Sequence, residues 1–213
     1  AAGLHPSQVQ IASLRCPSYT GDIYATAPEY ETNLGSVAVG NYVGIPGTHI
    51  KADGTLEENG ILVSKWSQRD GGGKGLRLRD VGDGISKTFL ACETREEAYG
   101  SWYDGQATWV TALMPNVNEN QFTKGLDGFD EAPPNSSALH VGPDDGGYFP
   151  AMQYPGQQAR EWGPSSDHSG YIVMHAFLDG HAMAVSADAD PTVYMRFVTR
   201  NGAEPADDFD LGY

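Results

Sequence analysis

Short apolar runs separated by turn residues make up most of the pattern along the chain. Gly, Pro, Asn and Asp recur every several residues, and this spacing interrupts any long helical periodicity. Short runs are typical of strands, so the pattern predicts strands at residues 37–45, 60–63, 88–93, 108–113, 171–178 and 181–185. We therefore expect a sheet-rich fold with many loops.

The clearest pair of runs flanks Asp179-Gly180. Asp-Gly between apolar runs is a strong signal for a two-residue hairpin turn, because both central positions of that turn need a positive φ. In this register Met174 faces Val185, on a face that is almost wholly apolar and that we expect to meet the core. His175 then lies on the other face, opposite to His181.

One helix is expected near the end of the chain. Asp190-Pro191 suits its start, because Asp caps a helix and Pro fits the first helical position. Asn201-Gly202 suits its end through a left-handed cap. Between them one apolar stripe recurs with helical spacing, formed by Val193, Phe197 and Val198. The predicted helix is short, so its stability depends on docking against the sheet.

Residues 114–165 carry little pattern, and Pro and Gly are frequent there. A long irregular stretch in a compact chain usually carries function or is an insertion. The length of 213 residues fits one domain, so we expect residues 1–213 to form a single globular domain with a loop-rich insertion at 114–165. Aromatic residues in or beside it either pin loops to the core or build a binding or subunit-contact surface. They are Trp102, Trp109, Tyr148, Tyr154 and Trp162.

The composition is acidic and narrows the classes of partner. The chain has 13 Lys and Arg against 28 Asp and Glu, a formal net charge of −15, and residues 101–213 hold 16 of these acidic residues but only 4 of the basic ones. Few cations are available to contact a phosphate backbone, so nucleic acid is not an expected partner. No apolar run reaches the roughly 18 residues of a membrane span. An acidic surface of this kind favours solubility outside a cell, or attracts divalent cations or basic partners.

Two cysteines, Cys16 and Cys92, leave the redox compartment open. They can form one disulfide in an oxidising compartment or remain buried thiols, because the sequence does not fix the distance between them. Their separation of 76 residues is not a metal-binding signature. The first six residues have neither the charged nor the apolar region of a signal peptide. An export signal, if the protein uses one, was therefore removed or lies outside this sequence.

No metal-binding motif is complete. H-E-x-x-H and C-x-x-C are both absent, and the predicted hairpin separates His175 from His181, which argues against a shared zinc site. Short acidic turns offer oxygen ligands for calcium, with Asp188 and Asp190 as candidates, but none completes an EF-hand loop. Calcium is therefore the one cofactor that the sequence leaves open.

A hydrolytic set can be drawn from Ser166, His168 and Asp179. It lacks the G-x-S-x-G elbow that presents a serine nucleophile in many hydrolases. Because no catalytic motif is complete, we expect a protein that is not an enzyme and assign no catalytic residues.

Six short segments follow one another along most of the chain. They are Cys16-Pro17-Ser18, Asn41-Tyr42-Val43-Gly44, Asn59-Gly60-Ile61-Leu62, 78–93, Ser166-Asp167-His168-Ser169-Gly170 with Asp179-Gly180, and 197–204. In this order they resemble the bacterial prepilin-type family DUF1559, whose C-terminal signature is H-X9-DG and whose I-x-D-G-T-S-N-T-x-x-x-x-E stretch is similar to residues 78–93. The resemblance implies an exported, pseudopilin-like domain in which a long N-terminal helix packs on an antiparallel sheet. It lends no catalytic residues, and it implies turn and hydrogen-bonding roles for Asp83, Gly84, His168, Asp179 and Gly180.

The chain also departs from the family's pattern. Ten residues rather than nine separate His168 from Asp179, which moves His168 to the other face unless a bulge at Ser169-Gly170 absorbs the extra residue. Lys87 stands where the family has Asn, and Tyr171 where it has a second Gly. The family's N-terminal pilin-like hydrophobic helix has no counterpart in these residues. Either that helix was removed or lies outside this sequence, or this member assembles by other surfaces.

Together these features favour an α+β, mainly β fold, with a pseudopilin-like antiparallel sheet, long irregular loops and few short helices. The expected function is that of an exported structural subunit at the cell surface, in the periplasm or outside the cell. It would assemble with copies of itself or with other proteins. The alternative is an extracellular module that binds a solute or glycan through the aromatic loops, and a hydrolase is third.

Overall fold

The computed structural model describes residues 5–27, 30, 35–48, 58–62, 76–104, 108–112, 140–141, 163–170, 172–186, 189 and 191–202. The described residues include the short 3-10 helices η1 (Pro6–Gln8), η2 (Ala12–Leu14) and η4 (Leu78–Asp80). Their strands are β1 (Tyr42–Gly44), β2 (Phe89–Glu93), β3 (His140–Val141), β4 (Ser165–Ser166), β5 (Ile172–Phe177) and β6 (Ala182–Ser186). The α-helix α3 spans Pro191–Val198. In these residues no helix is long and apolar enough to cross a bilayer.

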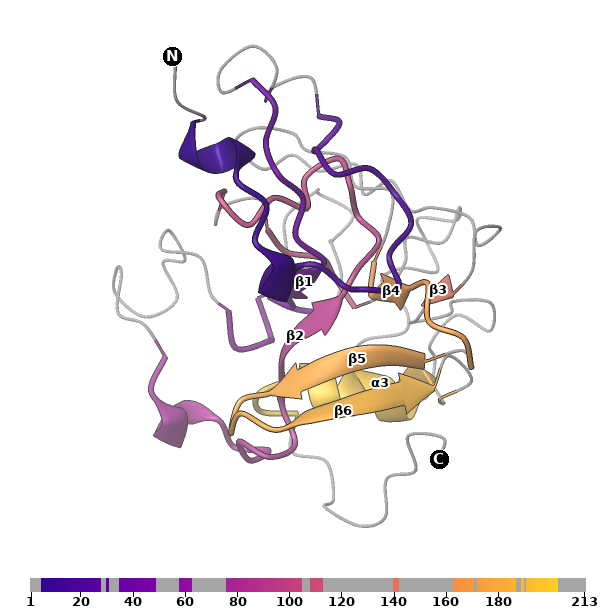
Figure 1. The fold of residues 1–213 in the computed structure, drawn as a ribbon. Coiled ribbons are helices and arrows are strands. Elements are labelled where there is room, and N and C mark those ends of the chain that lie inside the picture. Colours follow the sequence, from indigo (N-terminus) through magenta and orange to yellow (C-terminus); the bar gives the residue numbers. More distant parts are fainter. Residues whose placement is uncertain are drawn as a thin grey trace, which may run out of the picture.

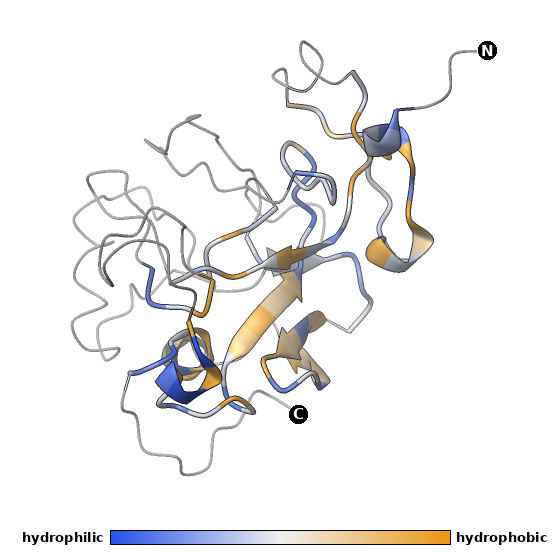
Figure 2. Ribbon diagram, turned by 90° about the vertical axis from the view of Figure 1, so that its left-hand side faces the viewer, coloured by the Kyte–Doolittle hydropathy of each residue, from blue (hydrophilic) through white to orange (hydrophobic). Residues whose placement is uncertain are grey.

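The main sheet has four antiparallel strands in the order β1-β2-β5-β6, and β3 and β4 form a separate parallel pair. Figure 1 shows α3 behind the β5–β6 hairpin, so the helix covers one face of the sheet. In Figure 2 the strands carry mostly the orange of hydrophobic residues. This arrangement confirms the predicted mainly β, α+β fold.

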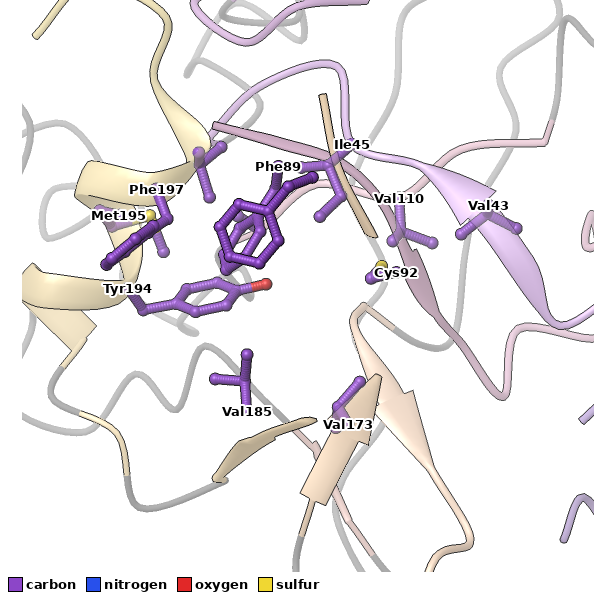
Figure 3. Packing of buried hydrophobic residues seen from close by; sticks show 13 residues of the cluster. Val43, Ile45, Phe89, Cys92, Val110, Val173, Val185, Tyr194, Met195 and Phe197 are labelled. Carbon is purple, nitrogen blue, oxygen red and sulfur yellow. The ribbon is translucent and has the colours of Figure 1, made fainter. Parts of the chain in front are cut away.

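The core forms where α3 packs against the sheet, and Phe89 of β2 is at its centre (Figure 3). The ring centroid of Phe89 lies 4.8 Å from that of Phe177, 5.4 Å from that of Tyr194 and 5.5 Å from that of Phe197. Aromatic rings at such separations gain edge-to-face and offset contacts beyond their buried area. The short helix is thus held by tertiary contacts, as its length requires.

The β5–β6 hairpin forms where the sequence predicts it, but its register and its core face are not the predicted ones. Ala176 pairs with Ala182, and the Phe177 N–H donates to the His181 carbonyl at 2.8 Å, so three residues rather than two form the loop. Gly180 supplies the positive φ of that loop, +93°. The buried positions of β5 are Val173, His175 and Phe177, so His175 enters the core and Met174 does not.

Helix α3 begins at Pro191, as predicted, and Phe197 and Val198 of its apolar stripe are buried. The helix ends at Val198, earlier than expected. The Gly202 N–H donates to the Asp83 carboxylate at 2.8 Å, which ties the segment after the helix to the segment before β2.

The remaining strand predictions are met in part. Only residues 42–44 of the run 37–45 form a ladder, and residue 109 of the run 108–113 forms a parallel bridge with Gly44. Residues 60–62 adopt no strand. Most of the loop-rich stretch 114–165 lies outside the described residues.

Candidate functional site

Three segments that are distant in the sequence meet at one buried cluster. Cys16 follows η2, Glu93 ends β2, and His168 lies in the connection between β4 and β5. The Cys16 Sγ is 3.5 Å from the His168 Nε2, and the same nitrogen is 3.0 Å from the Glu93 Oε1. The three atoms all lie within 4.8 Å of one another. In Figure 1 the indigo chain that leaves η2 runs past β1 and reaches β4.

Asn41 fixes the backbone at Cys16. The Cys16 N–H donates to the Asn41 Oδ1 at 3.0 Å, and the Asn41 side-chain amide donates to the Thr94 carbonyl at 3.1 Å. The Thr94 N–H donates in turn to the Asn41 carbonyl at 2.8 Å. Asn41 is itself 1% exposed, so these bonds form away from water and hold the N-terminal segment firmly against the end of β2.

Strand alternation directs Glu93 to the cluster. Cys92 faces the hydrophobic core, and the next side chain must therefore point to the opposite face of β2. Glu93 is only 1% exposed, yet its Oε2 accepts the Met174 N–H at 2.9 Å and its Oε1 faces His168. A buried carboxylate is tolerated only with such hydrogen-bonding partners, and the backbone of β5 together with His168 supplies them to Glu93.

His168 is held by two hydroxyl groups. Its Nδ1 is 3.1 Å from the Ser18 Oγ, and its backbone N–H donates to the Ser166 Oγ at 3.2 Å. Gly170 has a φ of +93° in the turn that follows, where the sequence suggested a bulge. His168 therefore lies before β5 rather than in it, and the extra residue between it and Asp179 is absorbed without placing its ring on a sheet face.

A second contact clamps the same N-terminal segment. The Thr20 N–H donates to the Asp167 Oδ2 at 3.0 Å, and Arg95 pairs with the Asp167 Oδ1 at 3.4 Å. The Arg95 side chain is 6% exposed and that of Asp167 is 19% exposed, so water screens this ion pair less than a surface pair. Residues 16–20 are thus fixed at both ends against β2 and the β4–β5 connection.

The geometry differs from that of a cysteine nucleophile with a histidine base. In such a relay the nucleophile and the orienting acid contact opposite ring nitrogens. Here the Cys16 Sγ and the Glu93 Oε1 share Nε2, and Ser18 contacts Nδ1. Burial raises the pKa of the Cys16 thiol, and the Glu93 carboxylate raises it further. A thiol in this setting is a weak nucleophile, because the reactive species is the thiolate.

Tyr42 lies over the cluster from the neighbouring strand. It pairs with Glu93 across the β1–β2 ladder, so the two side chains share one face of the sheet. Burial raises the pKa of the Tyr42 hydroxyl, with a further contribution from the Glu93 charge. Glu93 therefore raises the pKa of both Cys16 and Tyr42 and contacts the His168 ring. The atoms that converge here, from Cys16, Glu93 and His168, are of the kinds that bind metal ions.

Cys16 and Cys92 are both buried free thiols, not a disulfide. Cys92 belongs to the core cluster, and Figure 3 shows it beside Val110 and Val43. Cys16 contacts the opposite side of β2, where Glu93 points. A disulfide needs side chains directed at each other, so the alternation along β2 keeps the two sulfurs apart.

The hydrolytic set suggested by the sequence is not assembled. The Ser166 Oγ donates to the Ile172 carbonyl at 2.6 Å and does not contact the His168 ring. The Asp179 carboxylate accepts from the His181 backbone N–H at 3.1 Å, at the far end of β5. The six residues of β5 extend for about 20 Å between His168 and Asp179.

The two Asp-Gly positions serve in turns. Asp179 and Asp83 each accept backbone N–H groups, from His181 and Gly202 respectively. Gly84 and Gly180 have φ values of +98° and +93°, which side chains rarely adopt. These are contacts of turns and of local hydrogen bonds.

The predicted aromatic site is described only in part. The Trp102 Nε1 donates to the Val9 carbonyl at 2.9 Å, and Trp109 is half-buried beside β1. The other residues of that prediction, and both calcium candidates, lie outside the described residues: Tyr148, Tyr154, Trp162, Asp188 and Asp190.

Sequence reasoning missed the cluster of Cys16, Glu93 and His168. All three lie in segments that carry the family resemblance, which was the available signal. Their separations of 75 residues between Glu93 and His168 and 152 between Cys16 and His168 match no metal-binding or catalytic spacing.

One protein family matches the chain over residues 1–192, and its description is "Protein of unknown function (DUF1559)". The matched range includes the whole cluster and confirms the resemblance found in the sequence. No curated protein and no solved structure matches the chain. Since the match covers most of the sequence, the chain belongs to the DUF1559 family.

Proposed function

We propose that the protein is an exported, pseudopilin-like structural subunit of the cell surface, the periplasm or the extracellular space. It assembles with further copies of itself and does not catalyse a reaction. The observation that carries this proposal is a group of apolar and aromatic side chains, mostly exposed, which the N-terminal segment and residues 102–103 contribute together. We call it the aromatic patch and define it as His5, Val9, Trp102 and Tyr103.

The patch is contiguous and exposed. The Tyr103 ring centroid lies 5.8 Å from that of His5 and 5.7 Å from that of Trp102. Val9 is 45% exposed and Tyr103 is 41% exposed. Aromatic residues are enriched at protein interfaces, because they bury a large area at a low cost in side-chain entropy. Apolar groups gathered in this way favour a protein contact over an ordinary solvent-facing surface.

The backbone beneath the patch is well fixed. Val39 forms an antiparallel bridge with Ser101, and the Gly40 N–H donates to the Gly100 carbonyl at 2.6 Å. The Trp102 indole N–H joins the two halves of the patch by its bond to the Val9 carbonyl. A patch that is already ordered loses little entropy on binding, which favours a specific subunit contact.

Light scattering coupled to gel filtration tests this proposal on the full chain. We expect wild-type protein to form oligomers, and we expect Val9→Asp and Tyr103→Ser to shift it to monomer without a change in thermal midpoint. Leu78→Asp is the matched control, because Leu78 is 62% exposed but lies in η4, outside the patch. A wild-type protein that stays monomeric at high concentration, or oligomers that survive both patch variants, would contradict the proposal.

A further inference from the structure

We propose that Cys16, Glu93 and His168 bind one divalent transition-metal ion of the zinc class. The ligand atoms are the Cys16 Sγ, one Glu93 carboxylate oxygen and the His168 Nε2. Three protein ligands of sulfur, oxygen and nitrogen leave a fourth, tetrahedral position for water or another group. This inference is independent of subunit assembly.

The distances fit such a site. Zinc binds thiolate sulfur at about 2.3 Å and imidazole nitrogen at about 2.0 Å, so tetrahedral geometry sets sulfur and nitrogen about 3.5 Å apart. The Cys16 Sγ and the His168 Nε2 are 3.5 Å apart. The corresponding nitrogen–oxygen separation is about 3.3 Å, against 3.0 Å between His168 Nε2 and Glu93 Oε1. The remaining pair, the Cys16 Sγ and the Glu93 carboxylate oxygen, lies within 4.8 Å, so one ion can contact all three atoms after a side-chain adjustment.

The charges also match a divalent ion. A Cys16 thiolate and the Glu93 carboxylate together carry two negative charges, and a neutral His168 adds none. A dication therefore makes the buried cluster neutral, and binding releases the Cys16 thiol proton to solvent. Cys16 is 4% exposed and Glu93 is 1% exposed, so an uncompensated charge at either residue is costly.

Outer contacts already orient each ligand. The Ser18 hydroxyl oxygen can accept a hydrogen bond from the His168 Nδ1–H, which leaves Nε2 directed at Cys16 and Glu93. The Met174 N–H holds the second oxygen of Glu93, and Asn41 holds the backbone of Cys16. Bonds of this kind fix the tautomer and direction of metal ligands. The His168 side chain is 24% exposed, so solvent has access to the site on its side.

Thiolate and imidazole ligands select among cations. They suit zinc, cobalt or copper, whereas calcium and magnesium prefer six or more oxygen ligands. The bound ion would join the N-terminal segment to β2 and to the β4–β5 connection, so we expect it to stabilise the fold. At a free zinc concentration 100 times the dissociation constant, the thermal midpoint should rise by roughly 5–10 °C.

Titration of the reduced, chelator-treated full chain with Co²⁺ tests the site. We expect a thiolate-to-cobalt charge-transfer band that saturates at one equivalent and disappears when Zn²⁺ displaces the cobalt. Cys16→Ser should abolish the band, and Glu93→Gln and His168→Gln should each weaken binding by about tenfold or more. The matched control is Cys92→Ala, which removes the other buried thiol on the core face and should keep the band.

Two results would overturn the proposal. One is a wild-type chain that shows no thiolate band and no zinc-dependent rise in thermal midpoint at millimolar metal. The other is a band that survives in Cys16→Ser, because the cobalt thiolate would then lie elsewhere. If a variant does not fold, the wild-type spectrum and midpoint still decide the question. Light scattering of the patch variants tests assembly separately, so failure of one proposal leaves the other standing.

Discussion

Acidification should destabilise the protein through His175, a histidine placed inside the aromatic core. His175 is 1% exposed, and its ring centroid lies 4.4 Å from that of Phe89. Its Nδ1 is 3.0 Å from the Val173 carbonyl and its Nε2 is 2.7 Å from the Tyr194 hydroxyl. These bonds suit a neutral ring that donates from Nδ1 and accepts at Nε2. Burial lowers the pKa of His175 from 6.5 to about 4.

The sign and size of the effect follow from linkage. Above pH 6.5 the ring is neutral in both states and pH has little effect through it. Between 6.5 and about 4 the unfolded chain binds a proton that the folded protein does not, so stability falls as the pH falls. Each pH unit in that window lowers the free energy of unfolding by up to about 1.4 kcal/mol, and the whole pKa shift of His175 is equivalent to about 3 kcal/mol. Solvent screening does not reduce it, because the ring is buried.

Urea unfolding of wild type and His175→Gln at about pH 7 and about pH 4.5 measures this loss. Gln is neutral at both pH values, and its side-chain oxygen can still accept a hydrogen bond from the Tyr194 hydroxyl. The wild type should lose about 2 kcal/mol more free energy of unfolding than the variant between these two pH values. His181→Gln serves as control, because residue 181 is an exposed position after the Asp179-Gly180 turn. This variant should keep the wild-type difference in unfolding free energy between the two pH values. Equal losses in wild type and His175→Gln would refute the reasoning.

Three further changes test the fold. Phe89→Ala should cost about 3–5 kcal/mol in urea unfolding, because it leaves a cavity between β2 and α3; a loss below about 1 kcal/mol would contradict the assigned core. Gly180→Ala should lower the free energy of unfolding by about 1–2 kcal/mol through backbone strain alone, because φ is +93° and no atom lies within 4 Å of the added carbon. A neutral effect would mean that the turn differs. Both thiols should react slowly with a thiol reagent in the native protein and quickly in denaturant, because burial raises the pKa of Cys16 and of Cys92; fast native labelling of either would contradict the assigned burial.

The local pattern was sufficient for the position of several elements. β2, β5 and β6 lie within one residue of their apolar runs, and α3 begins at Pro191. These elements depend on local sequence features, namely the alternation of side chains, the turn residues and the fixed φ of proline. The turn at Asp179-Gly180 was evident for the same reason.

The face of β5 was not decided locally. Met174, Ala176 and Leu178 form the more apolar face in the sequence, yet Val173, His175 and Phe177 are the buried set. The Tyr194 hydroxyl from α3 and the Phe89 ring from β2 make the polar His175 acceptable in the core. A three-residue loop then shifts the register by one, a difference that Asp-Gly alone does not specify.

By itself, the sequence determined the mainly β class, the approximate strands and the family, because these depend on short-range pattern and on ordered motifs. Only the tertiary structure brought Cys16, Glu93 and His168 together. The sheet order β1-β2-β5-β6 places the end of β2 beside the start of β5. The hydrogen bonds of Asn41 hold the N-terminal segment against the end of β2. Contacts across 75 and 152 residues arise from that topology, and no periodicity along the chain encodes them.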